Sequence, residues 1–154
     1  MHRQLQRHHP GGNALGVRFP GCRPAVCGLD VWRADRGCEE RAVFKTLVAR
    51  GDKNGIHVFC IPVREELDLK KAAAVTDNKK VELVHVKELL NLTGYIRGGC
   101  SPIGMKKEYP VTIEETAVLF DTISISAGVR GGQIVIDPEK LSEFLGASFL
   151  DVVR

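Results

Sequence analysis

The sequence contains no apolar run that approaches the roughly 18–20 residues needed to span a membrane. Its first residues, MHRQLQRHHPGG, also lack the apolar segment of a secretory signal. Cysteine is sparse and odd in number, at five, and no C-x-x-C pair occurs. These absences argue against a membrane protein and a regular disulfide framework, so we expect a protein of the reducing cytoplasm.

Lysine is absent from the first 44 residues, which carry seven arginines and four acidic residues. That surplus of three positive charges equals the formal net charge of +3 of the whole chain, so the rest is balanced. Nucleic-acid contacts made by the rest must therefore come from local patches. A chain of 154 residues with 44% hydrophobic and 27% charged residues is large enough for one domain with a core.

The first 41 residues differ in composition from the remainder of the chain. They hold six glycines, three prolines, three of the five cysteines and the only tryptophan, without any sustained apolar period. We therefore divide the chain into an atypical segment, 1–41, and a regular domain, 42–154.

Three interpretations of this segment are open: a disordered extension, a zinc-binding arm, or a shifted reading frame at the start of the gene. The ligands of a zinc-binding arm would be Cys22, Cys27, Cys38 and either His8 or His9. Their spacings fit no common zinc finger, so we expect no metal and no cofactor.

From residue 42 onward, short apolar segments alternate with turn residues. Asp68 is a good helix cap, Pro138 suits the first position of a helix, and 51–55 (GDKNG) is strong turn chemistry. Expected strands cover 42–50, 56–63, 81–84, 111–113, 122–126, 133–136 and 147–153, and expected helices cover 69–75, 86–92 and 138–145. Hairpins mixed with single helices indicate class α/β or α+β, a mixed sheet or irregular barrel with helices outside.

The stretch 93–107, TGYIRGGCSPIGMKK, is rich in glycine and cannot continue a helix. The adjacent Gly98 and Gly99 allow the main chain to approach a ligand closely, and peptide N–H groups there can surround a partly negative oxygen. Arg97, Lys106 and Lys107 add positive charge on both sides. The alternative is a surface loop with solvated lysines.

Five short motifs follow one another along the chain: 43–47 (VFKTL), 67–73 (LDLKKAA), 93–95 (TGY), 98–107 (GGCSPIGMKK) and 124–131 (SISAGVRG). In this order and at this spacing they resemble the YbaK/EbsC family of free-standing aminoacyl-tRNA deacylases, which are related to the editing domain of prolyl-tRNA synthetases. The resemblance covers 42–154. It implies a mixed, barrel-like sheet of six or seven strands with flanking helices, and a pocket that hydrolyses mischarged tRNA, chiefly Cys-tRNA(Pro).

The resemblance also implies roles for individual residues. Lys45 matches the essential lysine of the family, and Gly98 and Pro102 match its G-x-x-x-P loop, which orients the substrate carbonyl. The remaining implied pocket residues are Thr46, Gly99, Ser101 and Ser126, and the implied contacts to tRNA phosphates are Arg97, Lys106 and Lys107. The implied partners are the acceptor end of tRNA(Pro) and prolyl-tRNA synthetase, with the protein a monomer or weak homodimer.

Two departures from the family pattern concern the pocket. Members carry a functional tyrosine in the N-terminal segment, where 1–41 has none, and often an Asp where this chain has Gln133. The resemblance implies that the thiol of the bound cysteine attacks its own ester, so that the protein needs no nucleophile. Two alternatives stay open: a tRNA- or synthetase-binding member without catalysis, and a metal or redox protein based on the N-terminal cysteines.

Overall fold

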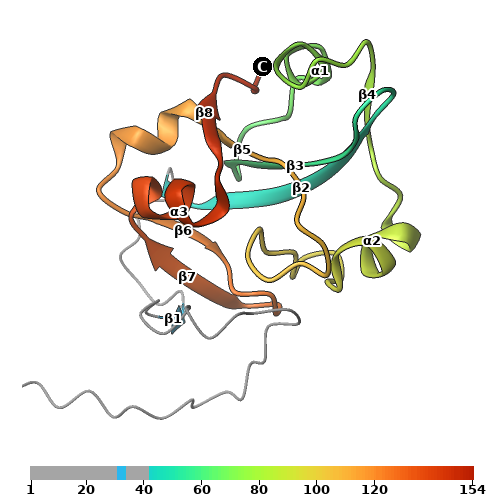
Figure 1. Cartoon of the computed structure of the whole chain (residues 1–154). Helices are drawn as coiled ribbons and strands as arrows, with labels where there is room; N and C mark the ends of the chain where they lie inside the picture. The colour runs from blue at the N-terminus through green and yellow to red at the C-terminus, as the bar shows by residue number, and fades with distance from the viewer. Residues whose placement is uncertain (1–30, 34–41) are drawn as a thin grey trace, which may run out of the picture.

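A computed structural model describes residues 31–33 and 42–154, and its described strands form two sheets (Figure 1). The larger sheet has five strands and is mixed: β3 is antiparallel to β2 and parallel to β5. Its order is β4 (Val81–Leu83), β2 (Phe44–Gly51), β3 (Gly55–Pro62), β5 (Val111–Glu114) and β8 (Ser148–Leu150). The predicted hairpin of β2 and β3 is therefore the centre of the fold.

The smaller sheet is antiparallel throughout. Its order is β1 (Val31–Arg33), β7 (Gly132–Ile136) and β6 (Ile123–Ser126). One parallel bridge, between Val43 and Ser124, connects the two sheets. The predicted class, mixed α and β, is confirmed. The predicted single barrel-like sheet of six or seven strands is not confirmed. One bridged pair does not join the two sheets into a continuous ladder, and the described strands do not close into a barrel.

The described helices are α1 (Leu69–Val75), α2 (Val86–Thr93) and α3 (Pro138–Leu145), together with a short 3₁₀ helix, η3 (Glu115–Leu119). The predicted cap of α1 is present, because Asp68 accepts the N–H groups of Lys70 and Lys71 at 2.8 and 3.1 Å. Gly94 ends α2 with a φ of 83°, a left-handed conformation that suits glycine. All three helices lie where the sequence predicts them; η3 and β1 were not predicted.

Strand β3 is buried on both of its faces. Its alternate residues Val58 and Cys60 belong to a core shared with the smaller sheet, α3 and the Gly-rich stretch. The residues between them, Phe59 and Ile61, pack on the other face against α1 and the C-terminal Val152. The five-stranded sheet is therefore the middle layer, and the Gly-rich stretch is part of the packing rather than a free surface loop.

One carboxylate is buried in the middle layer. Glu114, at the end of β5, is 1% exposed and accepts the Val152 N–H at 2.9 Å. Burial raises the pKa of Glu114, although hydrogen bonds from backbone N–H groups act in the opposite direction. Its contribution to stability is fully present below the unfolded-chain value of 4.5 and is lost as the pH rises through the raised pKa.

We therefore predict that Glu114→Gln raises the thermal midpoint at pH 7, because the amide keeps an acceptor oxygen and removes the buried charge. The gain over wild type should shrink toward pH 4, which thermal scans across that pH range would measure. Glu115→Gln, at the exposed neighbouring position, is the matched control and should change little. A less stable Glu114→Gln protein at pH 7 would show that the hydrogen bonds accepted by the charged carboxylate stabilise the fold by more than its burial costs.

Candidate functional site

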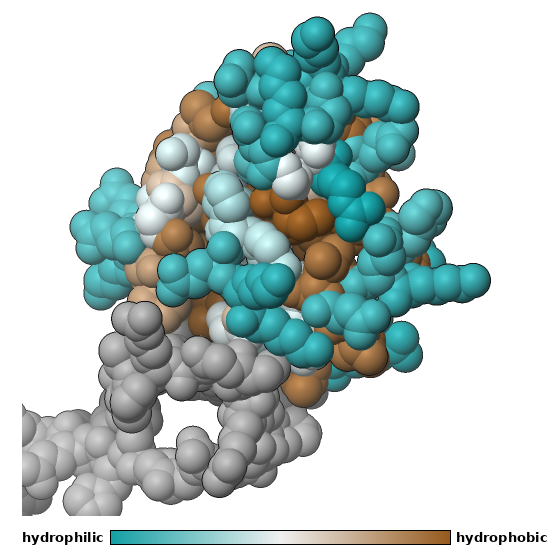
Figure 2. All heavy atoms as spheres, turned by 45° about the vertical axis from the view of Figure 1, so that its right-hand side comes forward, coloured by the Kyte–Doolittle hydropathy of each residue, from teal (hydrophilic) through white to brown (hydrophobic). Residues whose placement is uncertain are grey.

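A cavity of about 530 Å³ lies between β2, α2, the Gly-rich stretch and the smaller sheet. Figure 2 shows the side of the molecule that carries α2 and β4, where apolar residues reach the surface among hydrophilic ones. The cavity is lined by Val43, Phe44, Lys45, Thr46, Leu47, Val48, Val63, Leu83, Val84, Val86, Leu89, Arg97, Gly98, Cys100, Ser126 and Gln133. A mainly apolar lining with a few polar groups is typical of ligand pockets.

The cavity lies along an unpaired edge of β2. Strand β4 pairs only with the last three residues of β2, Ala49 to Gly51. Successive residues of an antiparallel strand direct their N–H and C=O groups to opposite sides. The Val43 carbonyl accepts the Val63 N–H, on the β3 side, and the Val48 carbonyl accepts the Val84 N–H, on the β4 side. The main-chain N–H and C=O of Thr46 therefore face away from β3, where β4 no longer covers them.

Lys45 lies on β2 at the rim of the cavity, half-buried. Its Nζ donates to the Val63 carbonyl at 3.2 Å, and Val63 lines the same cavity. This one bond leaves two ammonium hydrogens for a ligand. The neighbouring Thr46 hydroxyl lies 3.9 Å from the buried Cys60 Sγ. Lys45 is therefore a cation held in place at the cavity but not neutralised by an acid in the described part of the chain.

Gly98 reaches the same cavity from the Gly-rich stretch. Its φ of +84° is unfavourable for residues with a side chain, which accounts for glycine here. The Gly99 N–H is occupied, because it donates to the Ile96 carbonyl at 3.0 Å, whereas the Gly98 N–H has no acceptor among the described residues. The two adjacent glycines are thus not equivalent, and Gly98 supplies the available donor.

The structure brings together half of the residues predicted for the site. Lys45, Thr46, Arg97, Gly98 and Ser126 line the cavity. The others do not line it: Gly99, Ser101, Pro102, Lys106 and Lys107.

Ser101 is fully buried, and its hydroxyl accepts the Ile103 N–H at 3.2 Å, so its visible contact is within the loop. Lys106 and Lys107 are exposed beyond the cavity.

The aminoacyl-tRNA editing domain family matches residues 28–144 of this sequence. The chain belongs to the aminoacyl-tRNA editing domain family. An Enterococcus faecalis protein named "Putative Cys-tRNA(Pro)/Cys-tRNA(Cys) deacylase EbsC" is 49% identical over 116 residues, which are 75% of this chain and 71% of that protein. The resemblance found from the five motifs is therefore confirmed.

Solved structures show the same fold. A structure described as that of "a putative trans-editing enzyme for prolyl tRNA synthetase" superposes with a TM-score of 0.71 at 25% identity, over 75% of this chain and 73% of that one. The hypothetical protein APE2540 gives a TM-score of 0.70 at 22% identity, over 75% and 77% of the two chains. The editing-domain fold is thus shown by the structure as well as by the sequence.

In this editing domain, Gln133 lies opposite Ser126 across the β6–β7 ladder. Its amide oxygen accepts the Ser124 hydroxyl at 2.7 Å, which leaves the amide NH₂ as a donor at the cavity. The Ser126 hydroxyl accepts the Gly128 N–H at 3.2 Å and so also shapes the following turn. The sequence marks Gln133 only as a departure from the family pattern, and the structure places it in the cavity lining.

Other lining residues were not predicted. Val84, between β4 and α2, and Val86 and Leu89, in α2, form an apolar wall of the cavity. The sequence predicted a helix over 86–92, but it did not indicate that this helix borders a cavity.

Two buried thiols lie at or near the cavity: Cys100 lines it, and Cys60 lies behind the lining residue Thr46. Burial raises the pKa of Cys100 to about 11 and that of Cys60 to about 12. Both thiols therefore remain protonated near neutral pH and are poor nucleophiles. No group of three or more His, Cys, Asp or Glu side chains in the described ranges could hold a metal.

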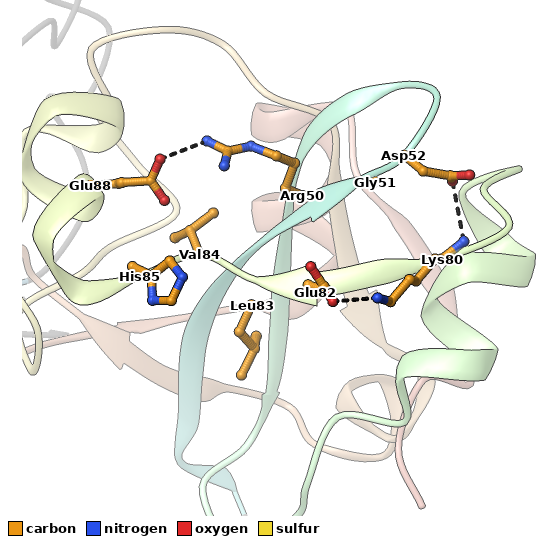
Figure 3. Close-up of a pocket in the computed structure, with 9 residues that line it drawn as sticks. All are labelled: Arg50, Gly51, Asp52, Lys80, Glu82, Leu83, Val84, His85 and Glu88. Carbon is orange, nitrogen blue, oxygen red and sulfur yellow. Dashed lines mark hydrogen bonds and ion pairs between the residues drawn. The ribbon is translucent and has the colours of Figure 1, made fainter.

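A second hollow lies on the other side of Leu83 and Val84, and its charges are internally paired (Figure 3). Arg50 lies 3.1 Å from Glu88, and Lys80 lies 2.6 Å from Glu82. The Lys80 N–H also donates to Asp52, which lowers the pKa of that carboxyl. These pairs leave no cation for a phosphate, so we assign the candidate site to the larger cavity.

No helix in the described part is long and apolar enough to cross a membrane.

We predict that Cys60 and Cys100 resist alkylation by iodoacetamide at pH 7.5 in the native protein, because neither forms appreciable thiolate at that pH. Both should react readily after denaturation, and peptide-resolved mass spectrometry measures each cysteine separately. Native modification of Cys100 at the rate of the denatured chain would restore it as a candidate nucleophile.

Proposed function

We propose that this editing domain is an aminoacyl-tRNA deacylase that removes cysteine from mischarged tRNA(Pro). The observation that supports this most is that Lys45 and Gly98, which are far apart in the sequence, line one cavity. The name of the Enterococcus faecalis relative, a Cys-tRNA(Pro)/Cys-tRNA(Cys) deacylase, supports the same substrate class.

The cavity suits the 3′ end of a charged tRNA. Its volume of about 530 Å³ is within the usual range of small-molecule sites and exceeds the needs of a cysteinyl group alone. The apolar wall of Val84, Val86 and Leu89 can accept the terminal nucleoside, while the polar groups gather at the β2 edge and the smaller sheet. We propose that the cysteinyl ester lies between Lys45 and Gly98, with Thr46, Ser126 and Gln133 around it.

In this arrangement the Gly98 N–H donates to the ester carbonyl oxygen, and the Lys45 ammonium stabilises the negative charge that develops on it. Donors fixed in advance around such an oxygen lower the barrier because no solvent has to reorganise. The main-chain N–H of Thr46, on the unpaired edge of β2, is a second donor within the same cavity.

The reaction proceeds without an enzyme nucleophile. The substrate thiol attacks the carbonyl carbon of its own ester, a carbon–sulfur bond forms, and the ester carbon–oxygen bond breaks. The thiol proton passes to the departing ribose oxygen, which gives free tRNA and a cyclic thioester that water then hydrolyses. The high pKa values of Cys60 and Cys100 agree with a mechanism that uses neither. Holding thiol and carbonyl in contact is a major contribution that a cavity can make.

Phosphates of the acceptor end would contact the cations beside the cavity. Arg97 is at its rim, and the exposed Lys106 and Lys107 follow in the same loop. We also propose that prolyl-tRNA synthetase supplies the mischarged tRNA and that residues 42–154 form the deacylase domain. The protein would act in the cytoplasm as a monomer or weak homodimer.

The second candidate function is tRNA or synthetase binding without catalysis. The observation that favours it is the absence of tyrosine from 1–41, where members of the family carry a functional one. The structure does not describe most of that segment. Retention of Cys-tRNA(Pro) on a filter without any turnover would support this function over deacylation.

We predict that Lys45→Ala lowers kcat/KM for Cys-tRNA(Pro) by about 100-fold or more, the usual cost of removing a group that stabilises the oxyanion. Release of labelled cysteine from charged tRNA is the measurement. Lys140→Ala is the matched control, because Lys140 is exposed on α3 and does not line the cavity. Full activity in Lys45→Ala would remove the proposed role of this lysine.

The substrate-thiol mechanism makes a separate prediction about the tRNA. Cysteine methylated on sulfur should be released at least about 100-fold more slowly than cysteine, because the attacking group is blocked while the ester is unchanged. Binding of the two charged tRNAs, measured by competition, should be similar. Equal release rates would indicate attack by water and would contradict this mechanism without contradicting deacylation.

A further inference from the structure

The turn between β6 and β7 packs directly on the loop that carries Gly98. A Cβ atom placed on Gly99 would lie 3.4 Å from the Arg130 main-chain nitrogen. A Cβ placed on Gly128 would lie 2.7 Å from the ring of Tyr95, which is too close for any side chain. The Tyr95 hydroxyl in turn donates to the Ile103 carbonyl at 2.5 Å, on the far side of the same loop. The two segments are therefore in close contact, and Gly128 has no room for a side chain.

Arg130, within this turn, holds one particular peptide group of the loop. Its Nε and Nη2 donate to the Arg97 carbonyl at 3.3 and 3.2 Å. That carbonyl and the Gly98 N–H belong to the same peptide unit. The chain has no cis peptide bond in its described part, so the carbonyl and the N–H of this unit point in opposite directions. A guanidinium that fixes the carbonyl therefore also fixes the direction of the Gly98 N–H.

The same contact strengthens the donor. A cation that bonds to a peptide oxygen draws electron density toward that oxygen, and the N–H of the unit becomes a stronger hydrogen-bond donor. Arg130 itself does not line the cavity, so it does not reach the position proposed for the ester. Its influence on the reaction would pass through the peptide unit of Arg97 and Gly98.

We infer that Arg130 is a positioning residue for deacylation, which orients and polarises the Gly98 N–H toward the substrate carbonyl. The inference rests on the proposed function, because it requires that Gly98 contacts the ester. It adds a residue that the family resemblance marked only as part of a motif, and it explains why the β6–β7 turn and the Gly-rich loop are packed so closely.

The test compares deacylation kinetics of wild type, Arg130→Ala and Arg130→Lys on Cys-tRNA(Pro). Loss of the guanidinium should lower kcat by on the order of 10- to 100-fold and leave KM within about threefold, because binding is kept and alignment is lost. Arg130→Lys keeps a cation and one donor and should recover part of kcat. Unchanged kcat in Arg130→Ala, with wild type active, overturns the inference and leaves the proposed function intact.

Salt dependence separates positioning from direct binding of tRNA. If Arg130 contacted a phosphate, its removal would raise KM and reduce the slope of log KM against log salt by about one. A positioning residue leaves that slope unchanged. Arg97→Ala is the informative comparison, because it removes a charge at the cavity but keeps the main-chain carbonyl that Arg130 holds. This variant should therefore change KM and the salt slope rather than kcat. A changed slope with unchanged kcat in Arg130→Ala contradicts the inference.

A second measurement does not require activity. The Gly99 N–H, bonded to the Ile96 carbonyl, reports on the order of the loop through its hydrogen exchange. Arg130→Ala should speed exchange at Gly99 by about tenfold or more while Lys140→Ala leaves it unchanged. Unchanged exchange in Arg130→Ala would show that Arg130 does not hold this loop, whether or not the wild-type protein deacylates tRNA. If Arg130→Ala speeds exchange but the wild-type protein shows no turnover, the proposed function fails and the loop contact stands.

Discussion

The half-paired strand β2 is the constraint on which the rest of the structure depends. Along its whole length β2 is bonded to β3, whereas β4 covers only Ala49 to Gly51. Strands in a folded core normally have both edges satisfied, because unpaired peptide groups are costly when they are buried. Here the uncovered part faces a cavity, and residues of α2 and the Gly-rich loop line it as well. The candidate site thus lies along the part of β2 that β4 does not pair with.

In the proposed deacylase, this arrangement would explain why few charged side chains are needed. A main-chain donor at Gly98, another at Thr46 and a single ammonium at Lys45 surround a space in which the other walls are apolar. Main-chain groups lose little conformational entropy when a ligand binds, because the fold has already ordered them. Packing of the loop on the β6–β7 turn keeps Gly98 in place, so the proposed mechanism relies on the backbone more than on side chains.

Local sequence signals predicted most of the elements. Asp68, Gly94 and Pro138 mark helix ends through their own conformational preferences, and the structure has helices at those positions. The η3 helix was missed because five residues of a 3₁₀ helix carry no apolar period. The division into two sheets was missed because pairing between distant strands depends on tertiary packing. Single-strand patterns do not show where a ladder ends.

For the site, the sequence indicated which residue types are present, but not where their side chains and N–H groups point after folding. Lys45 and Gly98 were found through the resemblance, and the structure brings both to one cavity. Ser101 and Gly99 belong to the same loop as Gly98, but both form hydrogen bonds within that loop, Ser101 with Ile103 and Gly99 with Ile96. The roles proposed for Arg130 and Gln133 could not have been assigned from the sequence, because they depend on which carbonyl or hydroxyl lies opposite each side chain after folding.

The buried Glu114 has a consequence for the C-terminal end of the described chain. Its carboxylate accepts the Val152 N–H, Lys71 bonds both Asp151 and the Val153 carbonyl, and the Arg154 N–H donates to the Glu66 carbonyl. Loss of Val152 would deprive the buried carboxylate of one of its backbone donors, at a cost of about 1–3 kcal/mol for such a group. Residues 151–154 therefore belong to the packed domain and contribute to its stability.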